Sequence, residues 1–506
     1  MDIIARKVQK IFKLIATSRA SPSVRKLAFA LLEKVPERNY LSEISSIFYW
    51  VRDKVRYTHD PYKTDVFEDA EWTLKTLAGD CFTLDTDIVV RSKITGFYDV
   101  LPLGALEVNF YQYEALSYNF TEGKFEFKDI LGWFRRGIKD VYLVKTDNGF
   151  EFKCTLNHRF FRLYMKPYSM KEVTLGEIKE EIDWENNKGR STNTTRRVAC
   201  AYKIPSLDVS IDSPDELWLA GIYAAEGGYD PLGYDKMFIA NDDPVLREEI
   251  RERLDRIGVP YSESKRLKHS YITIRASSFR DRLKELGGTS LSKTIPPRIL
   301  SATVEGLEAF VDAFAKGDAY IPRRFDRTRV LIHNTSSLDF VKRLKLIYLI
   351  LGRALSYYYQ ENHMGAGSHP IWRLNEPRRG MVRKKREWFP GIEVRTIKSI
   401  THVGQEETCD IFVADNHNFV LWNGVIAHNC DAHSVLLGSL LEAIGYPVRL
   451  KVVSYDGIRY SHIYPLVGDR PWNPTKWIPL DATIPWAKPG YERPYIKARV
   501  FEAKEQ

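Results

Sequence analysis

Two borders in the sequence carry residues that could rearrange a peptide bond. The first is Cys81, which follows Asp80, and the second is the run His428-Asn429-Cys430. A thiol can attack the carbonyl carbon of the preceding residue and form a thioester, and a second thiol can take over the acyl group. An asparagine amide can cyclise on its own carbonyl, polarised by an adjacent histidine, and release the segment before it. The borders therefore predict an insert that removes itself and leaves Asp80 joined to Cys430.

The first step needs assistance because an amide resists attack by a thiol. Residues 141–155 carry a hairpin pattern with an Asp-Asn-Gly turn, and this pattern leads into Thr155-Leu156-Asn157-His158. A histidine placed by the hairpin could twist or protonate the amide, while Thr155 holds its carbonyl. We therefore expect Thr155 and His158 to lie beside Cys81.

The ordered set of residues resembles an intein. The resemblance rests on Cys81, on Thr155-x-x-His158, on the closing His428-Asn429-Cys430, and on the stretches Cys409-Asp410-Ile411-Phe412-Val413 and Asn416-His417-Asn418-Phe419. It implies an all-β Hint splicing fold that excises residues 81–429. It also implies that Asp410 supports the first two steps and that His417 assists the transesterification or the asparagine step. The insert of 349 residues is far longer than this β fold needs.

The surplus length contains two related stretches. Residues 219–227 read L-A-G-I-Y-A-A-E-G, and residues 311–319 read V-D-A-F-A-K-G-D-A. Both resemble the LAGLIDADG motif of homing endonucleases, in which two helices pack on small residues and each ends in an acid that faces DNA. The resemblance implies an inserted α+β endonuclease that cuts double-stranded DNA at the uninterrupted host gene. Glu226 and Asp318 would hold Mg²⁺ against the scissile phosphate.

Two positions depart from this motif. Ala224 stands where the family often has Asp, at a packing position, and Ala319 replaces the final glycine, which predicts a distorted backbone beside Asp318. The alternative is a decayed nuclease, or two ordinary packing helices that each end in an acid. Two basic clusters fit phosphate contacts, although charge runs are usually solvated faces. They comprise Arg323, Arg324, Arg327 and Arg329, and then Arg378, Arg379, Arg383, Lys384, Lys385 and Arg386.

Joining the two flanks gives a host of 157 residues, a suitable size for one domain. We expect Cys430 in the first turn of an apolar helix over residues 431–444, where the helix dipole favours a thiolate. His462 follows in a strand and Asp481 at a strand end. Such residues can act as nucleophile, base and orienter.

This order resembles the transglutaminase-like superfamily, which has a papain-like α+β fold. The resemblance implies Cys430 as nucleophile, His462 as base and Asp481 as orienter, with a protein or peptide amide as substrate and no cofactor. Because the superfamily includes inactive members, the alternative is a non-catalytic interaction module. A second alternative is an insert that does not splice and stays in place as a DNA-binding protein.

Helices and strands must position these residues, and the apolar spacing predicts where they lie. The predicted helices cover about 4–15, 22–32, 41–55, 71–77, 215–225, 306–316 and 431–444. The predicted strands cover 83–90, 98–103, 141–145, 150–155, short pieces from 392 to 426, then 448–454, 460–467 and 477–480. The polar, basic stretch 170–205 predicts a linker.

The chain of 506 residues is too long for one core, and we expect five segments. They are 1–80 and 430–506 for the host, 81–205 and 389–429 for splicing, and 206–388 for the endonuclease. The net charge of +9 permits nucleic-acid binding without requiring it. Five cysteines without a C-x-x-C pair favour a reducing, cytoplasmic location. Charged residues in the first apolar stretch exclude a signal peptide. No apolar run is as long as the roughly 18 residues that a transmembrane helix needs, so we expect no membrane partner.

Overall fold

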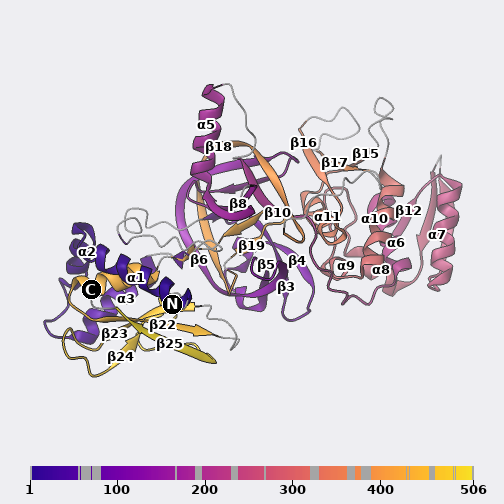
Figure 1. Cartoon of the computed structure of the whole chain (residues 1–506). Helices are drawn as coiled ribbons and strands as arrows, with labels where there is room; N and C mark the ends of the chain where they lie inside the picture. The colour runs from indigo at the N-terminus through magenta and orange to yellow at the C-terminus, as the bar shows by residue number, and fades with distance from the viewer. Residues whose placement is uncertain are drawn as a thin grey trace.

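The computed structural model describes residues 3–54, 57–58, 70, 81–165, 168–188, 196–229, 237–266, 269–319, 330–361, 371–377, 389–416, 418–428, 430–431, 433–454, 462–482, 484 and 486–503 (Figure 1). Several predicted features lie outside these residues: Asp80, His417, Asn429, the helix over 71–77 and both basic clusters. The side chains of Cys430 and His462 are also outside the description.

The two ends of the chain fold together, although the insert separates them in sequence (Figure 1). Their elements are α1 (Ile3–Ser18), α2 (Pro22–Leu32), α3 (Tyr40–Lys54), α12 (His433–Ala443) and a sheet of β24 (Trp477–Pro479), β23 (His462–Gly468), β22 (Val448–Ser454) and β25 (Lys497–Glu502). Phe48 of α3 shares a buried core with Leu436 and Leu440 of α12. Gly438 lets α1 approach closely, because a Cβ there would lie 2.7 Å from Ile15. The host is therefore assembled before any joining of its halves.

Cys430 lies before α12 rather than in its first turn, so this part of the sequence prediction is wrong for the unspliced chain. The helix begins at His433, and residues 430–431 form β21 (Cys430–Asp431). This strand pairs antiparallel with β1 (Tyr57–Thr58), with Thr58 opposite Cys430. Strand pairing with β1 engages backbone groups at this border and keeps Cys430 and Asp431 extended.

Two sheets build the splicing region. The larger has the order β10 (Arg197–Ala201), β18 (Ile392–Val413), β2 (Phe82–Thr83), β7 (Glu151–Cys154), β6 (Lys124–Thr146), β5 (Tyr113–Asn119), β3 (Asp87–Ser92) and β4 (Tyr98–Pro102). The smaller has the order β19 (Asn418–Val420), β20 (Ile426–His428), β8 (Arg159–Met165) and β9 (Tyr168–Thr174). Two 3₁₀ turns, η1 (Leu103–Leu106) and η2 (Phe110–Gln112), cover one edge. The predicted hairpin is confirmed, with Gly149 at a φ of 85° in its turn.

The short strands predicted after residue 392 are instead one long strand. β18 runs from Ile392 to Val413 and pairs along its length with β6. Its register shifts at four places, and each bulge resets the alternation of side chains between the two faces. Because the alternation restarts, the sequence pattern looks like several short strands.

Residues 170–205 do not form a linker, which corrects the prediction. They contain most of β9, then α5 (Leu175–Lys188) and β10. Leu175, Ile178 and Ile182 are buried on one face of α5 and join the core of the splicing region. This apolar stripe is narrow, and the many charged residues of the helix concealed it in the sequence.

The third region is built on two long helices, α6 (Pro214–Glu226) and α10 (Val304–Asp318), as predicted. The other helices are α7 (Pro244–Arg256), α8 (Ser277–Lys284), α9 (Pro297–Leu300) and α11 (Leu338–Leu351). One sheet has the order β11 (Gly227–Tyr229), β12 (Met237–Ala240), β14 (His269–Ile274) and β13 (Tyr261–Arg266). The other has the order β15 (Val330–Thr335), β17 (Ile371–Pro377) and β16 (Ser356–Gln360).

This helical region packs directly onto the splicing region. One buried apolar cluster runs through both, from Val89 and Tyr98 to Leu344. The backbone N–H of Tyr98 donates to Ser301 Oγ at 2.7 Å, and Arg343 pairs with Asp99 at 2.7 Å. Among the described helices, none is long and apolar enough to cross a membrane.

Candidate functional site

Cys81 is held by two hydrogen bonds to Thr155. The backbone N–H of Cys81 donates to Thr155 Oγ1 at 3.3 Å, and the backbone N–H of Thr155 donates to the Cys81 carbonyl at 3.0 Å. Cys81 is fully buried at the start of β2, which pairs with β7 just before Thr155. Thr155 therefore contacts the nitrogen of the Asp80–Cys81 peptide bond. Its predicted contact with the carbonyl concerns Asp80, which is outside the described residues.

His158 lies next to this pair, as predicted. Its backbone N–H donates to the Thr155 carbonyl at 3.1 Å. Its ring is fully buried between Phe82, at 3.9 Å between ring centres, and Phe160, at 5.0 Å. Neither ring nitrogen has a hydrogen-bond partner within the described part of the chain. Burial, with a contribution from the charge of Arg159, holds the pKa of His158 well below its usual 6.5. The ring is therefore neutral near pH 7, which disfavours the predicted role as an acid that protonates the amide.

Cys409 and Asp410 approach the same border from β18. The register places Cys409 opposite Phe82, and both Cys409 and Asp410 are buried. Burial raises the pKa of Cys409, and the charges of Asp410 and Cys81 add to this effect. Asp410 Oδ1 accepts the backbone N–H of Ile411 at 2.8 Å. The structure thus brings Asp410 to the border region of Cys81 from a strand far away in sequence.

His428 lies two residues before Cys430 at the second border, and it contacts a residue that the sequence did not single out. It ends β20, is 2% exposed, and its Nε2 lies 3.3 Å from Glu172 Oε1. Glu172 Oε2 lies 3.5 Å from Arg159 Nη1. The local sequence around Glu172 gives no motif. The structure finds it only through strand pairing, because β9 pairs with β8, the strand that follows His158.

The two motif helices pack on small residues, as the resemblance implied. A Cβ at Gly221 of α6 would collide with the carbonyl oxygen of Phe310 in α10. A Cβ at Gly317 would lie 2.6 Å from the Cβ of Ala225. Ala224 is buried, which agrees with a packing role. Both helices end together, so their terminal acids share one environment.

Ala319 does not distort the end of its helix, and the expectation that it would is wrong. Its φ and ψ are −83° and 140°, and those of Gly227 at the equivalent position are −87° and 156°. This is extended backbone that any residue adopts. Asp318 therefore ends α10 in the same way as Glu226 ends α6.

Glu226 and Asp318 form a close electrostatic group with Lys293, which the sequence reading missed. Burial raises the pKa of Glu226, and the charge of Asp318 raises it further. Burial also raises the pKa of Asp318, while electrostatic interactions with His333 and Lys293 act in the opposite direction. Burial lowers the pKa of Lys293, and the two carboxylates oppose this. Lys293 Nζ donates to the carbonyls of Ala224 and Ala225, which fixes it at the end of α6.

This group has the chemistry to hold a divalent cation. The charge of Asp318 raises the pKa of Glu226, so these two carboxylates are oxygen ligands whose repulsion a cation would relieve. No cluster of three acidic, histidine or cysteine ligands occurs in the described residues, so these two acids would be the only such side chains from that part of the chain. The residues present fit Mg²⁺, which keeps several waters and needs only one or two carboxylates.

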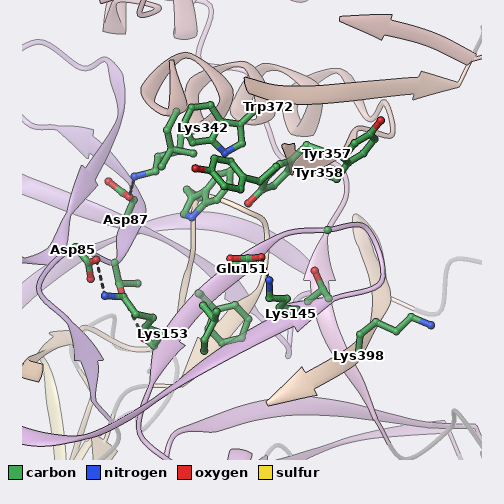
Figure 2. A pocket seen from close by; sticks show the side chains of 18 of the residues that line it. Asp85, Asp87, Lys145, Glu151, Lys153, Lys342, Tyr357, Tyr358, Trp372 and Lys398 are labelled. Atoms are coloured by element: carbon green, nitrogen blue, oxygen red, sulfur yellow. Dashed lines mark hydrogen bonds and ion pairs between the residues drawn. The ribbon is translucent and has the colours of Figure 1, made fainter. Parts of the chain in front are cut away.

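A cavity of about 740 Å³ lies where the splicing and helical regions meet (Figure 2). It is lined on one side by Asp87, Lys145 and Lys153 and on the other by Lys342 and Trp372. Figure 2 shows Lys342 reaching across it to an ion pair with Asp87. None of the predicted catalytic residues is among those that line it.

The structure describes only part of the predicted host site, because the side chains of Cys430 and His462 lie outside the described residues. Asp481 is 2% exposed and lies two residues after the end of β24, whose neighbour β23 begins at His462. Ser434 Oγ in the first turn of α12 donates to the Ile463 carbonyl at 3.1 Å. The helix that follows Cys430 is therefore attached to the strand that begins at His462, and Asp481 lies beside that strand.

Comparison with known proteins gives one family match. The model of the intein splicing domain matches residues 91–429. No curated protein matches the chain.

Solved structures give weaker similarities. The Ssp DnaB mini-intein variant M86 is 14% identical over 69% of this chain and 94% of its own, with a TM-score of 0.26. The DnaB intein from Synechocystis sp. PCC 6803 is 14% identical over 69% and 99%, with a TM-score of 0.23. The homing endonuclease I-DmoI, in complex with DNA and Mn, is 12% identical over 32% and 89%, with a TM-score of 0.25. TM-scores this low carry no argument about fold or activity.

Proposed function

This chain belongs to the intein splicing domain family, and from that premise we propose that residues 81–429 excise themselves and join Asp80 to Cys430. The observation that carries the proposal is the pair of hydrogen bonds between Cys81 and Thr155, with the ring of His158 buried beside them. A buried thiol held in this way next to its own scissile amide is arranged to react with a neighbouring carbonyl, because its geometry is fixed before the reaction.

The first step is an acyl shift at Cys81. Its Sγ attacks the Asp80 carbonyl carbon, the bond from that carbon to the Cys81 nitrogen breaks, and the nitrogen takes up a proton. Thr155 holds this nitrogen in place through its Oγ1. The neutral ring of His158 acts by donating a hydrogen bond or by twisting the amide, since it carries no proton to give as an imidazolium near pH 7.

The remaining steps release the insert. Cys430 Sγ attacks the same carbonyl carbon and frees the Cys81 thiol. The side-chain nitrogen of Asn429 then attacks its own main-chain carbonyl, with His428 polarising that carbonyl, and the bond to the Cys430 nitrogen breaks as that nitrogen takes up a proton. This nitrogen attacks the thioester, so an ordinary amide joins Asp80 to Cys430. Asp410 supports the early steps, and His417 supports the transfer or the cyclisation.

Expression of the full chain tests this proposal. Splicing gives two products of roughly 40 and 18 kDa, by length at about 115 Da per residue of the 58.7 kDa chain. The Asn429→Ala variant keeps the insert attached to the second half of the host, while thiols still cleave the chain at Cys81. A single stable band of full length from the unaltered chain would reject splicing and favour the alternative of a DNA-binding insert that stays in place.

We further propose that the excised insert cuts double-stranded DNA at the uninterrupted host gene. Glu226 and Asp318 would hold Mg²⁺ between the motif helices, and the bound ion would stabilise charge on the scissile phosphate. Lys293, which interacts electrostatically with both acids, would stabilise the same negative charge. The support is the effect of the Asp318 charge on Glu226, the interaction of both acids with Lys293, and the close packing of the helices that end in them.

A plasmid that carries the joined coding sequence around the Asp80–Cys430 junction tests the nuclease. We expect Mg²⁺-dependent linearisation that is lost in Glu226→Gln and in Asp318→Asn. Asp281→Asn is the matched control, because Asp281 is an exposed acid of the same region. Binding of the plasmid without cleavage by the unaltered insert would support the alternative of a decayed nuclease.

For the spliced host we propose a thiol enzyme that acts on a protein or peptide amide, with Cys430, His462 and Asp481 as nucleophile, base and orienter. The support is the burial of Asp481 beside the strand that begins at His462, and the attachment of α12 to that strand. A reactive thiol needs a reducing compartment such as the cytoplasm.

Iodoacetamide labelling of Cys430 tests this proposal. Fast labelling would support the enzyme if its rate falls in Asp481→Asn but not in the surface variant Asp469→Asn. Labelling no faster than a Cys430→Ser control, without amidase activity, would support a non-catalytic interaction module.

A further inference from the structure

Glu172 is a buried acid that contacts the histidine beside the second border. Its side chain is 7% exposed on β9, and its Oε1 lies 3.3 Å from Nε2 of His428. Its other oxygen lies 3.5 Å from Arg159, whose side chain is 11% exposed. One carboxylate thus connects an imidazole and a guanidinium in a site nearly closed to solvent.

The strand register fixes this arrangement. β8 lies between β20 and β9, with Phe160 opposite Ala427 and Phe161 opposite Glu172. Continuing the first register by one residue places Arg159 opposite His428. Residues two apart on a strand share a face, so Arg159, Phe161, Glu172 and His428 all lie on one face of the sheet. The ring of Phe161 lies 5.7 Å from that of His428, which restricts how the histidine can turn.

The groups around Glu172 suit an ionised carboxylate. A guanidinium and an imidazole nitrogen close to a buried carboxyl group both favour its charged form, which would be costly to bury without such neighbours. An ionised carboxylate at Nε2 favours the histidine form that carries a proton on that nitrogen. The other nitrogen, Nδ1, is then the one that can serve the reaction. The same logic makes the carboxylate of a Ser-His-Asp triad an orienter of its histidine.

We propose that Glu172 is a positioning residue for asparagine cyclisation, which holds His428 in the orientation and tautomer that polarise the Asn429 carbonyl. This inference rests on the proposed splicing function, to which it adds a residue and a step. Arg159 secures the carboxylate from its other side. Because Arg159 directly follows His158, this small sheet connects the residues that serve the two borders.

Cleavage of the full-length chain at single borders tests the proposal. In the Cys81→Ala background only the bond before Cys430 can break, and release of the last 77 residues reports the asparagine step. We expect Glu172→Gln and Glu172→Leu to slow this release about 10- to 100-fold, a part of what general acid–base assistance usually contributes. Glu172→Asp should restore part of the rate. Glu181→Gln is the matched control, because Glu181 pairs with Arg162 of the same strand β8, and it should leave the rate unchanged.

Cleavage at the other border separates positioning from a structural role. In the Asn429→Ala background, thiol-induced cleavage at Cys81 should change less than about twofold in Glu172→Gln, since an intact fold leaves this step alone. Equal slowing at both borders would show that Glu172 only supports the fold and would overturn the proposal. An unchanged rate of release of the last 77 residues would overturn it as well.

A measurement that does not need splicing tests the contact itself. In a chain with both Cys81→Ala and Asn429→Ala, ¹⁵N resonances of labelled histidine report which nitrogen of His428 is protonated. We expect protonation at Nε2 in this chain and in its Glu181→Gln form, and a mixture of tautomers in its Glu172→Leu form. The same tautomer in all three would overturn the proposal. If the unaltered chain does not splice, the proposed function is rejected. The role of Glu172 in cyclisation is then rejected too, even if the tautomer of His428 depends on Glu172.

Discussion

Thr155 makes two hydrogen bonds to Cys81: its Oγ1 accepts the Cys81 N–H, and its own N–H donates to the Cys81 carbonyl. The pairing of β2 with β7, in which Phe82 lies opposite Cys154, keeps Cys81 and Thr155 next to each other. The nitrogen that must leave in the first step is therefore the atom that the hydroxyl contacts.

Thr155→Ala should slow thiol-induced cleavage at Cys81 about three- to tenfold, the effect of losing one hydrogen bond of about 1 kcal/mol. Thr155→Ser keeps the oxygen and should stay near the original rate. The assay is cleavage by dithiothreitol in the Asn429→Ala chain. A Thr155→Ala chain that cleaves at the original rate would show that the backbone contact alone positions Cys81.

His158 should make the splicing region sensitive to acid. Its folded-state pKa is lowered far below 6.5, so above about pH 6.5 neither state binds a proton and the residue has no effect. Below that pH the unfolded chain binds a proton that the folded chain excludes, and stability falls continuously towards the folded-state pKa. His158→Phe, with a ring suited to the space between Phe82 and Phe160, should flatten this loss. The onset of thermal unfolding from pH 7 to 5 in the Cys81→Ala, Asn429→Ala chain measures it, with exposed His402→Gln as control.

Lys342 should stabilise the contact between the splicing and helical regions. Burial raises the pKa of Asp87, and the charge of Lys342 opposes this, so Lys342→Met leaves a buried carboxylate without that partner. We expect a loss of about 1–3 kcal/mol. Thermal unfolding of the splicing-blocked chain measures it. Lys398→Met, at the other end of the same cavity, should have little effect (Figure 2), and adding Asp87→Asn to Lys342→Met should recover part of the loss.

The two motif helices should respond differently to changes at their small residues. Gly221→Ala introduces a Cβ that collides with the Phe310 carbonyl. We expect the resulting overpacking to lower the free energy of unfolding by about 1–3 kcal/mol and to abolish DNA cleavage. Ala319→Gly restores the more usual residue but should leave cleavage unchanged, because the backbone of Ala319 is already in an unstrained extended conformation. A marked gain of cleavage in Ala319→Gly would contradict this explanation.

Lys293→Met should abolish DNA cleavage while leaving DNA binding within a few-fold. Its ammonium group is fixed on carbonyls at the end of α6 and interacts electrostatically with Glu226 and Asp318, so we expect it to act on the phosphate at the proposed reaction centre. Gel-shift and cleavage assays on one target separate the two effects. Lys284→Met is the control, since its ammonium group is exposed on a neighbouring helix.

Much of the fold followed from local sequence. Apolar spacing placed α1, α2 and α3 to within about three residues, and the Asp-Asn-Gly turn placed the β6–β7 hairpin. The short order Cys81, Thr155, His158 was enough to expect one site, because a hairpin joins the second and third to a neighbouring strand. The failures were at α5, whose narrow apolar stripe was outnumbered by charges, and at β18, whose bulges broke its alternation.

The sequence by itself determined which residues we propose for each reaction, because border cysteines, asparagine and paired acids carry their chemistry in their type. Only the tertiary structure decided which neighbours set their ionisation and orientation. Glu172 reaches His428 through three strands, and Lys293 reaches Glu226 and Asp318 from a separate loop. It also decided that Cys430 is held extended against β1 before splicing, and that His158 is neutral. Burial and long-range pairing produce these effects, and both depend on contacts that local sequence does not encode.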